Sequence, residues 1–372
     1  MMRPAFLSTR QAGGFAMLLL VLLALPAVVG KSLLPAREQS YASQSWGTGP
    51  FPWIQQQLFE EKGDIDVAFV GSSHILHCID ARRVQATLSR KLGRPATVRV
   101  IGWGGAGYDA LYFITKDLLE HRKVNLLVFY DEDNGAGSRN TKSPAWFRWA
   151  DDAGSLAGLP LTEQAYFYFA SLVGMPRNLL CLLRPNLPAD VHAQNYWEEH
   201  YRSTSLADNL GSTSSELGLA SLPNADTDPA VPFVPFSPEN GATPEDACIY
   251  SSATKTNFQF STQPLPPWQL HFMRLFATSA RQHGSRLVLL HIPVMSEIRS
   301  PVIQERAFWP QMIGADLTMM GVPPAKMFAG IQDPDVCKLY FNRSHFNQNG
   351  QAFFTSLILP SILQIYETRA NH

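Results

Sequence analysis

An alternation of apolar strands and amphipathic helices constrains the fold of this chain more than any other feature. Apolar runs at residues 66–71, 96–101 and 124–130 are separated by helical segments at 79–92 and 110–121. Strands that are buried on both faces are apolar throughout, and strand–helix–strand units of this length build parallel sheets. We therefore predict an α/β fold with three layers, α/β/α, around a mainly parallel sheet.

The same alternation returns towards the C-terminus, where helical and apolar segments again follow one another. We expect a helix from Trp268 to a stop at Gly284, a strand at 286–292 before Pro293, a helix at 308–320, and a last helix at 351–368 interrupted at Pro360.

The segment between these two halves, 138–262, does not follow the pattern. It contains one apolar helical candidate, 163–183, and then a stretch at 204–247 that is rich in Ser, Pro, Gly, Asn and Asp. Such a composition buries too little apolar surface to form a core, so we expect a long, partly disordered loop or lid. A single α/β domain, 64–372, would thus be split by an insertion.

The N-terminus carries a long apolar stretch. Arg3 and Arg10 precede the uncharged residues 12–30, and a helix needs about 20 apolar residues to cross a bilayer. Positive charges before such a helix favour a cytoplasmic N-terminus. We predict a transmembrane anchor over 1–30, with a cleaved signal peptide and a buried core helix as the alternatives. An anchor or a signal peptide places the rest of the chain in the periplasm or outside the cell.

The net charge of the chain limits the classes of partner that it is expected to bind. The chain of 372 residues has a formal charge of −1 and a pI near 6.8. No excess of basic residues exists to bind nucleic acid or a charged membrane surface. Residues 31–63 are polar and rich in aromatics, so we expect them to form a stem between the anchor and the domain.

Neither a cofactor nor a metal is expected. Gly102, Gly104 and Gly107 do have the G-x-G-x-x-G spacing of a dinucleotide site, but the chain shows no clear acidic signature for binding the ribose, so we expect no such site. His74, His77 and His291 have no carboxylates placed beside them in the sequence that would complete a metal site. No C-x-x-C pair occurs, so disulfides and separate buried thiols both stay open for the four cysteines, Cys78, Cys181, Cys248 and Cys337.

Polar and glycine-rich segments follow the first three predicted strands, and another precedes the last helix. Gly71-Ser72-Ser73-His74 ends the first strand, where a serine is either an exposed nucleophile or the cap of the next helix. Segments 102–109 and 130–135 follow the second and third strands. Asn342–Gly350 contains His345, a candidate general base. Because the carboxyl ends of parallel strands meet at one edge of the sheet, the first three segments are expected to form one site.

In this order, these segments resemble the SGNH (GDSL-type) hydrolase superfamily over residues 64–135 and 268–365. Ser73 takes the position of the nucleophile, and Gly105 is the best match for the oxyanion glycine. Asn134 or Asp133 takes the place of the oxyanion asparagine. His345 takes the position of the base, with Asn347 and Gly350 in register after it. The resemblance implies a flavodoxin-like α/β/α domain.

The chain departs from the family at Asn342, where the family has the aspartate that orients the histidine. Asn342 is the aligned candidate for that role, and Asp333, Asp335 or a backbone carbonyl are the alternatives. An asparagine supplies no charge to stabilise an imidazolium, so an inactive site is also open.

The G-S-S start and the anchor look most similar to the extracytoplasmic branch that includes alginate O-acetylation factors and proteins of teichoic-acid D-alanyl transfer. This likeness implies acyl transfer or ester hydrolysis on a cell-envelope or exported polysaccharide, with the O-acetyl group as the favoured acyl group. It also implies a membrane O-acyltransferase as a partner. The alternative is an inactive scaffold that presents a polymer.

Overall fold

The structure, a computed structural model, describes part of the chain. The described residues are 8–33, 37–42, 51–105, 107–130, 139–140, 142–171, 265–297, 308–331, 333–336, 339–340 and 344–370. The chain divides into two compact units. One comprises Met1–Ser43 and Pro144–Leu187, and the other comprises Gln44–Ser143 and Pro188–His372.

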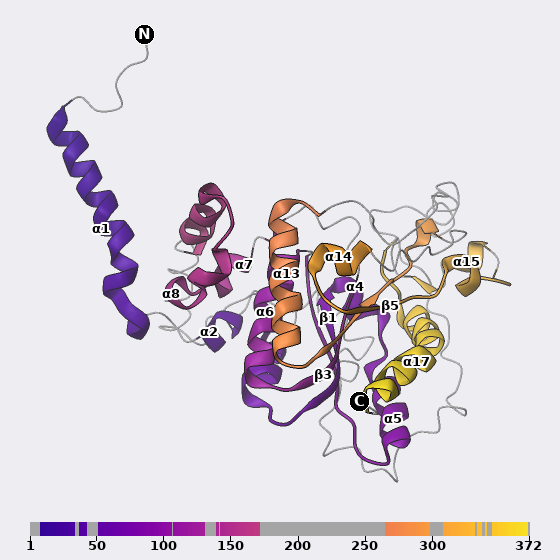
Figure 1. Ribbon diagram of the computed structural model, residues 1–372. Helices are drawn as coiled ribbons and strands as arrows, with labels where there is room; N and C mark the ends of the chain where they lie inside the picture. Colours follow the sequence, from indigo (N-terminus) through magenta and orange to yellow (C-terminus); the bar gives the residue numbers. More distant parts are fainter. Residues whose placement is uncertain are drawn as a thin grey trace. The chain divides into compact units, whose positions relative to one another are not determined.

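A five-stranded parallel sheet forms the second unit (Figure 1). Its strands are β1 (Ile65–Ser72), β2 (Val98–Trp103), β3 (Val124–Tyr130), β4 (Arg286–Leu290) and β5 (Leu317–Met320). Their spatial order is β2-β1-β3-β4-β5, so the chain moves outward from β1 in one direction to β2 and then in the other to β3. In sheets of this order, ligands bind at the carboxyl ends of β1 and β3, where the direction reverses.

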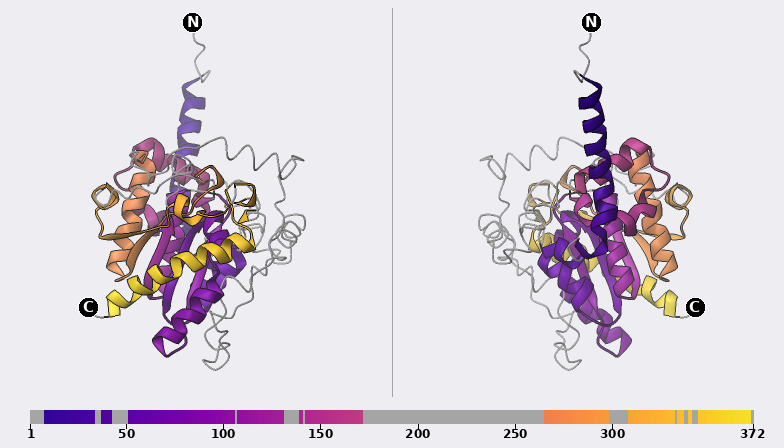
Figure 2. Two further views of the ribbon diagram at one scale, coloured as in Figure 1. Left: turned by 90° about the vertical axis from the view of Figure 1, so that its right-hand side faces the viewer. Right: turned by 90° about the vertical axis from the view of Figure 1, so that its left-hand side faces the viewer.

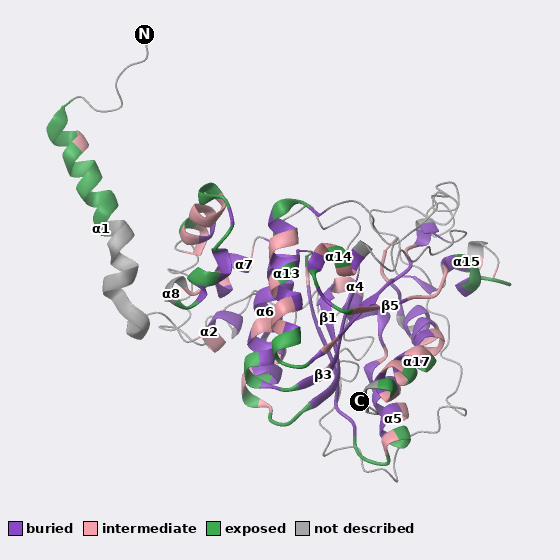
Figure 3. Cartoon of the chain, viewed as in Figure 1, coloured by how far each residue is buried: buried purple, intermediate pink, exposed green. Residues whose placement is uncertain are grey.

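Helices cover both faces of the sheet (Figure 2). On one face, α4 (Ser73–Cys78), α5 (Ala81–Leu92) and α17 (Gln348–Ala370) pack against Val67, Phe69 and the strand residues in register with them. On the other face lie α6 (Tyr108–His121) and α13 (Pro267–Gln282), where Phe276 meets Phe129 at 4.9 Å between ring centroids. Strands β1 to β4 are buried along almost their whole length, which explains their mostly apolar sequences (Figure 3).

The predicted α/β fold with a parallel sheet is confirmed, and two element predictions near the C-terminus are wrong. Residues 308–320 are not one helix: α14 (Phe308–Ile313) ends at Gly314, whose φ of +67° favours glycine, and β5 follows. Pro360 does not interrupt the last helix, because α17 continues through it. Pro360 lies on the exposed side of α17, so the proline ring does not displace core residues.

Several short elements complete the second unit. Its first residues include α3 (Phe51–Gln55) and the π-helix η2 (Gln56–Glu60), in which Phe51, Ile54 and Leu58 are buried. The later part of the predicted stem therefore belongs to the α/β unit. The remaining elements are η6 (Met295–Glu297), α15 (Pro324–Met327) and α16 (Asp333–Val336).

The first unit joins residues from before and after the first three strands. It contains α1 (Thr9–Leu33), α2 (Arg37–Ala42), α8 (Trp149–Asp152), η3 (Ala153–Leu156) and a helical segment at 161–171, while α7 (Ser143–Trp146) spans the boundary. Arg37 of α2 pairs with Asp152 of α8 at 2.7 Å. The start of the predicted insertion thus packs against the start of the predicted stem. Residues 172–264, the rest of the insertion, lie outside the described residues.

Within the described ranges, no helix combines the length and the apolar character needed to span a bilayer. The membrane anchor stays a prediction.

Candidate active site

Ser73 lies at the carboxyl end of β1, at the reversal point of the strand order. It is the first residue of α4, directly after the last residue of the strand. Gly71 of β1 lets the Tyr130 and Ile75 side chains approach the strand closely, because a Cβ at this position would meet the Tyr130 ring at 2.9 Å and Ile75 at 2.8 Å. Ser72 is in register with Trp103, so the glycine-rich loop after β2 leaves the sheet beside Ser73.

The structure brings Ser73 and His345 into direct contact. The Ser73 Oγ lies 2.8 Å from the His345 Nε2, although the two residues are 272 positions apart. This is the separation of a normal hydrogen bond, and a base in this position can accept the serine proton. The pairing expected from the sequence is therefore present as a contact.

A tightly built turn carries His345. The Asn347 side-chain oxygen accepts the backbone N–H groups of Asn349 at 3.0 Å and Gly350 at 3.1 Å, which caps the start of α17. A Cβ on Gly350 would lie 1.9 Å from the Leu339 carbonyl oxygen, so only glycine fits. Asn347 and Gly350, which follow His345 in the resemblance, thus fix the backbone that presents the histidine.

The other ring nitrogen of His345 contacts a serine. The Ser344 Oγ lies 3.1 Å from the His345 Nδ1. Asn342 and the side chain of Asp333 lie outside the described residues, and Asp335 lies half-buried in α16. The orienting roles that the sequence suggested for these three residues stay predictions.

Two further histidines surround His345. The His74 ring is stacked on it at 4.5 Å between centroids, and the His77 ring meets it edge-on at 5.2 Å. Burial lowers the pKa of His74 to about 4. Burial and the neighbouring His74 lower the pKa of His77 to about 3. Burial, His74 and His77 together lower the pKa of His345 to about 2. All three rings are therefore neutral at pH 7, and a neutral His345 can accept a proton on the nitrogen that faces Ser73.

The neighbouring serine has a different partner. Ser72 is buried, and its hydroxyl forms a hydrogen bond with the Tyr130 hydroxyl at the end of β3. The same Tyr130 oxygen lies 3.4 Å from the His74 Nδ1. Ser72 thus joins a network with Tyr130 and His74, while Ser73 is the serine on His345.

Residues from beyond β3 hold the glycine-rich loop after β2. Gly105 has a φ of +91°, and its carbonyl accepts the Asn140 side-chain amide at 3.4 Å. The Asn140 backbone N–H in turn donates to the Asp109 carboxylate at 3.1 Å. Burial raises the pKa of Asp109 to about 6, against the Ser143 side-chain and Asn140 backbone hydrogen bonds, which lower it. Asn134, the expected oxyanion asparagine, and Asp133 lie outside the described residues.

A lysine completes the support of this loop. The Lys142 ammonium donates to the Gly104 carbonyl at 3.4 Å and lies 5.9 Å from the centre of the Phe51 ring. Burial lowers its pKa to about 8. The sequence did not predict a role for Asn140, Lys142 or Ser344. Asn140 and Lys142 follow β3 through a polar stretch without a recognisable spacing, and Ser344 is only a neighbour of a candidate base.

In the part of the chain that the structure describes, no three His, Cys, Asp or Glu residues are placed to hold a metal ion. Cys78 is a buried free thiol, and burial raises its pKa. Cys181, Cys248 and Cys337 lie outside the described residues.

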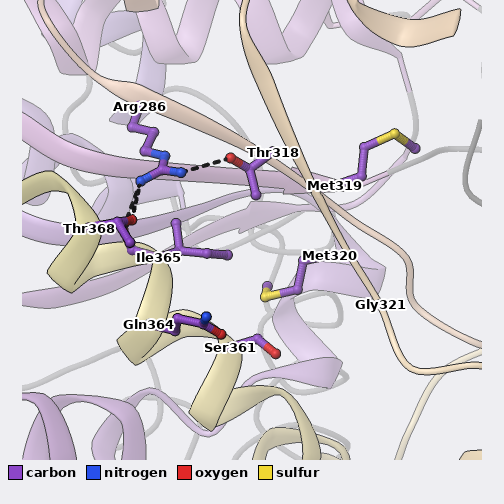
Figure 4. Close-up of a pocket in the computed structure, with 9 residues that line it drawn as sticks. All are labelled: Arg286, Thr318, Met319, Met320, Gly321, Ser361, Gln364, Ile365 and Thr368. Carbon is purple, nitrogen blue, oxygen red and sulfur yellow. Dashed lines mark hydrogen bonds between the residues drawn. The ribbon is translucent and has the colours of Figure 1, made fainter. Parts of the chain in front are cut away.

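A separate pocket of about 360 Å³ lies along the edge strand β5 (Figure 4). Arg286 crosses it and donates hydrogen bonds to Thr368 at 2.7 Å and Thr318 at 3.2 Å. The residues that line it come from β4, β5, the residue after β5, and α17, and none is a predicted site residue.

No protein-family model matches the chain, and a search of the curated proteins also found no match.

Proposed function

We propose that this protein is an SGNH-type serine enzyme that hydrolyses or transfers acyl esters on a cell-envelope or exported polysaccharide. The O-acetyl group is the favoured acyl group. The observation that carries the proposal is the 2.8 Å contact between the Ser73 Oγ and the His345 Nε2 at the carboxyl end of β1. A serine next to a neutral base at a strand end is the arrangement that nucleophilic catalysis requires.

In the first half of the reaction, the Ser73 oxygen attacks the ester carbonyl while its proton moves to the His345 Nε2. The tetrahedral intermediate then expels the alcohol, which takes that proton from His345, and the acyl group stays on Ser73. The backbone N–H groups of Ser73 and Gly105 are the proposed oxyanion donors, with the Asn134 amide as a third.

In the second half, a hydroxyl group attacks the acyl-serine carbonyl. His345 accepts the proton of this hydroxyl and returns it to the Ser73 oxygen as the acyl group leaves. Water as the acceptor gives an esterase, whereas a sugar hydroxyl gives a transferase. A membrane O-acyltransferase is the proposed source of the acyl group in the transferase.

The proposed location is the cell membrane, with the α/β unit on the periplasmic or outer side. The apolar side chains of α1 support an anchor: Met17 is 68% exposed and Leu20 is 64% exposed. Burial of such side chains in lipid stabilises the inserted helix. Mass spectrometry of the membrane fraction should find the chain with residues 1–30 intact, and a soluble form that begins near Lys31 would instead mean signal cleavage.

A fluorophosphonate probe tests the proposed chemistry. Wild-type protein should become labelled at Ser73, and Ser73→Ala should lower labelling and p-nitrophenyl acetate hydrolysis by at least about a thousandfold. Ser72→Ala is the matched control, and it should keep labelling because Ser72 contacts Tyr130 rather than His345. Labelling that survives Ser73→Ala and disappears in Ser72→Ala would reverse the assignment. No labelling of the folded wild type would favour the inactive scaffold.

A further inference from the structure

The hydrogen bond between Ser344 and His345 has a defined donor and acceptor. For the Ser73 hydroxyl to donate to the His345 Nε2, that nitrogen must carry a lone pair, so the ring hydrogen is on Nδ1. The Nδ1–H then points to an acceptor, and the Ser344 Oγ lies 3.1 Å away.

We infer that Ser344 is a positioning residue of this site: its hydroxyl oxygen accepts the His345 Nδ1 hydrogen and holds the ring in the tautomer that faces Ser73. This inference deepens the proposed function and rests on it. It gives Ser344 the orienting task that the family's aspartate performs, and it does so without a charge.

Packing and hydrogen bonds hold the backbone that follows Ser344. Phe346 is buried and forms an isolated antiparallel bridge with Tyr340, and its ring lies 5.4 Å from that of Phe354. The cap formed by Asn347 follows at once. Ser344 and His345 thus precede a fixed point of the chain, so a short side chain can reach Nδ1 reproducibly.

A hydroxyl group and a carboxylate differ in what they do for the protonated ring. Both accept the Nδ1 hydrogen, but only a carboxylate offers a negative charge to the imidazolium that forms when Ser73 loses its proton. Among the described residues, His74 and His77 are the titratable groups whose rings contact His345, and both disfavour its protonation. Ser344 therefore fixes orientation while leaving the ring weakly basic.

The first test measures the tautomer and needs no activity. Protein carrying ¹⁵N-labelled histidine, with the His345 signals assigned by their loss in His345→Gln, should show His345 as the Nδ1–H tautomer. In Ser344→Ala the signals should shift towards a mixture of both tautomers, and in Ser344→Thr they should stay as in the wild type. Ser356→Ala is the matched control, since it removes a part-buried hydroxyl bonded to the Phe353 carbonyl at 2.6 Å.

The second test measures kinetics and their pH dependence. Ser344→Ala should lower kcat for p-nitrophenyl acetate by about tenfold with little change in KM, and Ser344→Thr should restore most of it. Ser344→Asp should introduce a loss of activity between pH 5 and 7 that the wild type lacks, because a carboxylate favours protonation of His345. The thermal midpoint of each variant shows whether the fold is intact.

The outcomes separate the two proposals. If Ser73 is not labelled in the wild type but Ser344→Ala still changes the tautomer, the proposed enzyme fails while the positioning role holds. An unchanged tautomer and an unchanged kcat in folded Ser344→Ala overturn the positioning role, whatever the activity of the wild type. The positioning role of Ser344 is also overturned if Asn342→Ala changes the His345 tautomer and kcat while Ser344→Ala changes neither.

Discussion

Strand β1 begins beside Asp66 and ends beside Ser73, and both ends carry buried polar groups. At Asp66 the charges are balanced. Its carboxylate accepts two hydrogen bonds from Arg94, at 2.6 and 3.0 Å, one from the Thr97 backbone at 2.8 Å, and one from the Tyr366 hydroxyl. Burial opposes ionisation here, but the Arg94, Tyr366 and Thr97 hydrogen bonds outweigh it and lower the pKa of Asp66.

At the Ser73 end the buried groups are neutral instead. Three histidine rings lie in contact, and burial lowers the pKa of each, so none carries a charge at pH 7. A balanced ion pair stabilises one arrangement of the chain, whereas neutral bases beside a hydroxyl leave a proton free to move. The same strand thus supports structure at one end and proposed chemistry at the other.

Loss of the Asp66 carboxylate, at the start of β1, should have the largest effect on the free energy of unfolding. Asp66→Ala removes four hydrogen bonds at a nearly buried carboxylate, and we expect it to lower the free energy of unfolding by about 3 kcal/mol. Urea denaturation at pH 7 measures this loss. Ser73→Ala is the control, and it should unfold close to the wild-type midpoint. Equal losses in the two variants would remove the distinction between the ends of β1.

The pH dependence of stability should reveal the neutral histidines. Their pKa values are lower in the folded state than the ordinary value of 6.5, so their contribution is fully present above pH 6.5 and is lost as the pH falls. For His77, with a folded pKa of about 3, the cost at pH 5 is about 2 kcal/mol. His77→Phe should lose less stability between pH 7.5 and pH 5.0 than the wild type does, as measured by urea midpoints. An equal decrease in both proteins would mean that His77 is not held neutral by burial.

The smallest effect is expected from a substitution that adds a negative charge near His345, at the Ser73 end of β1. Asn342→Asp should raise esterase turnover by about tenfold, because an aspartate near His345 would stabilise the imidazolium. Steady-state kinetics with p-nitrophenyl acetate measures the change. If Asp333 or Asp335 already supplies the charge, the substitution should be neutral or harmful, and Asp→Asn at that residue should abolish turnover. A scaffold protein would respond to neither change.

The amino-acid sequence by itself determined most of the secondary structure and the order of its elements. The apolar runs that became β1, β2, β3 and β4 were recognisable because strands buried on both faces are mostly apolar. The helices between them showed the helical period and local stops, such as Gly93 with its φ of +63° after α5. These signals are local, so they need no knowledge of the fold. Strand β5 was missed because its four residues, three half-buried and one buried, are too few to show a period.

Only the tertiary structure decided how the candidate site is assembled. The sequence suggested Ser73 and His345, but their contact joins residues 272 positions apart and depends on how α17 packs against α4. Tertiary packing also creates the ring contacts of His345 with His74 and His77. It likewise creates the hydrogen bond from Asn140 to the Gly105 carbonyl. Ser344 illustrates the physical reason: the side chain that reaches Nδ1 depends on the backbone of a packed turn, and residue spacing alone does not specify that geometry.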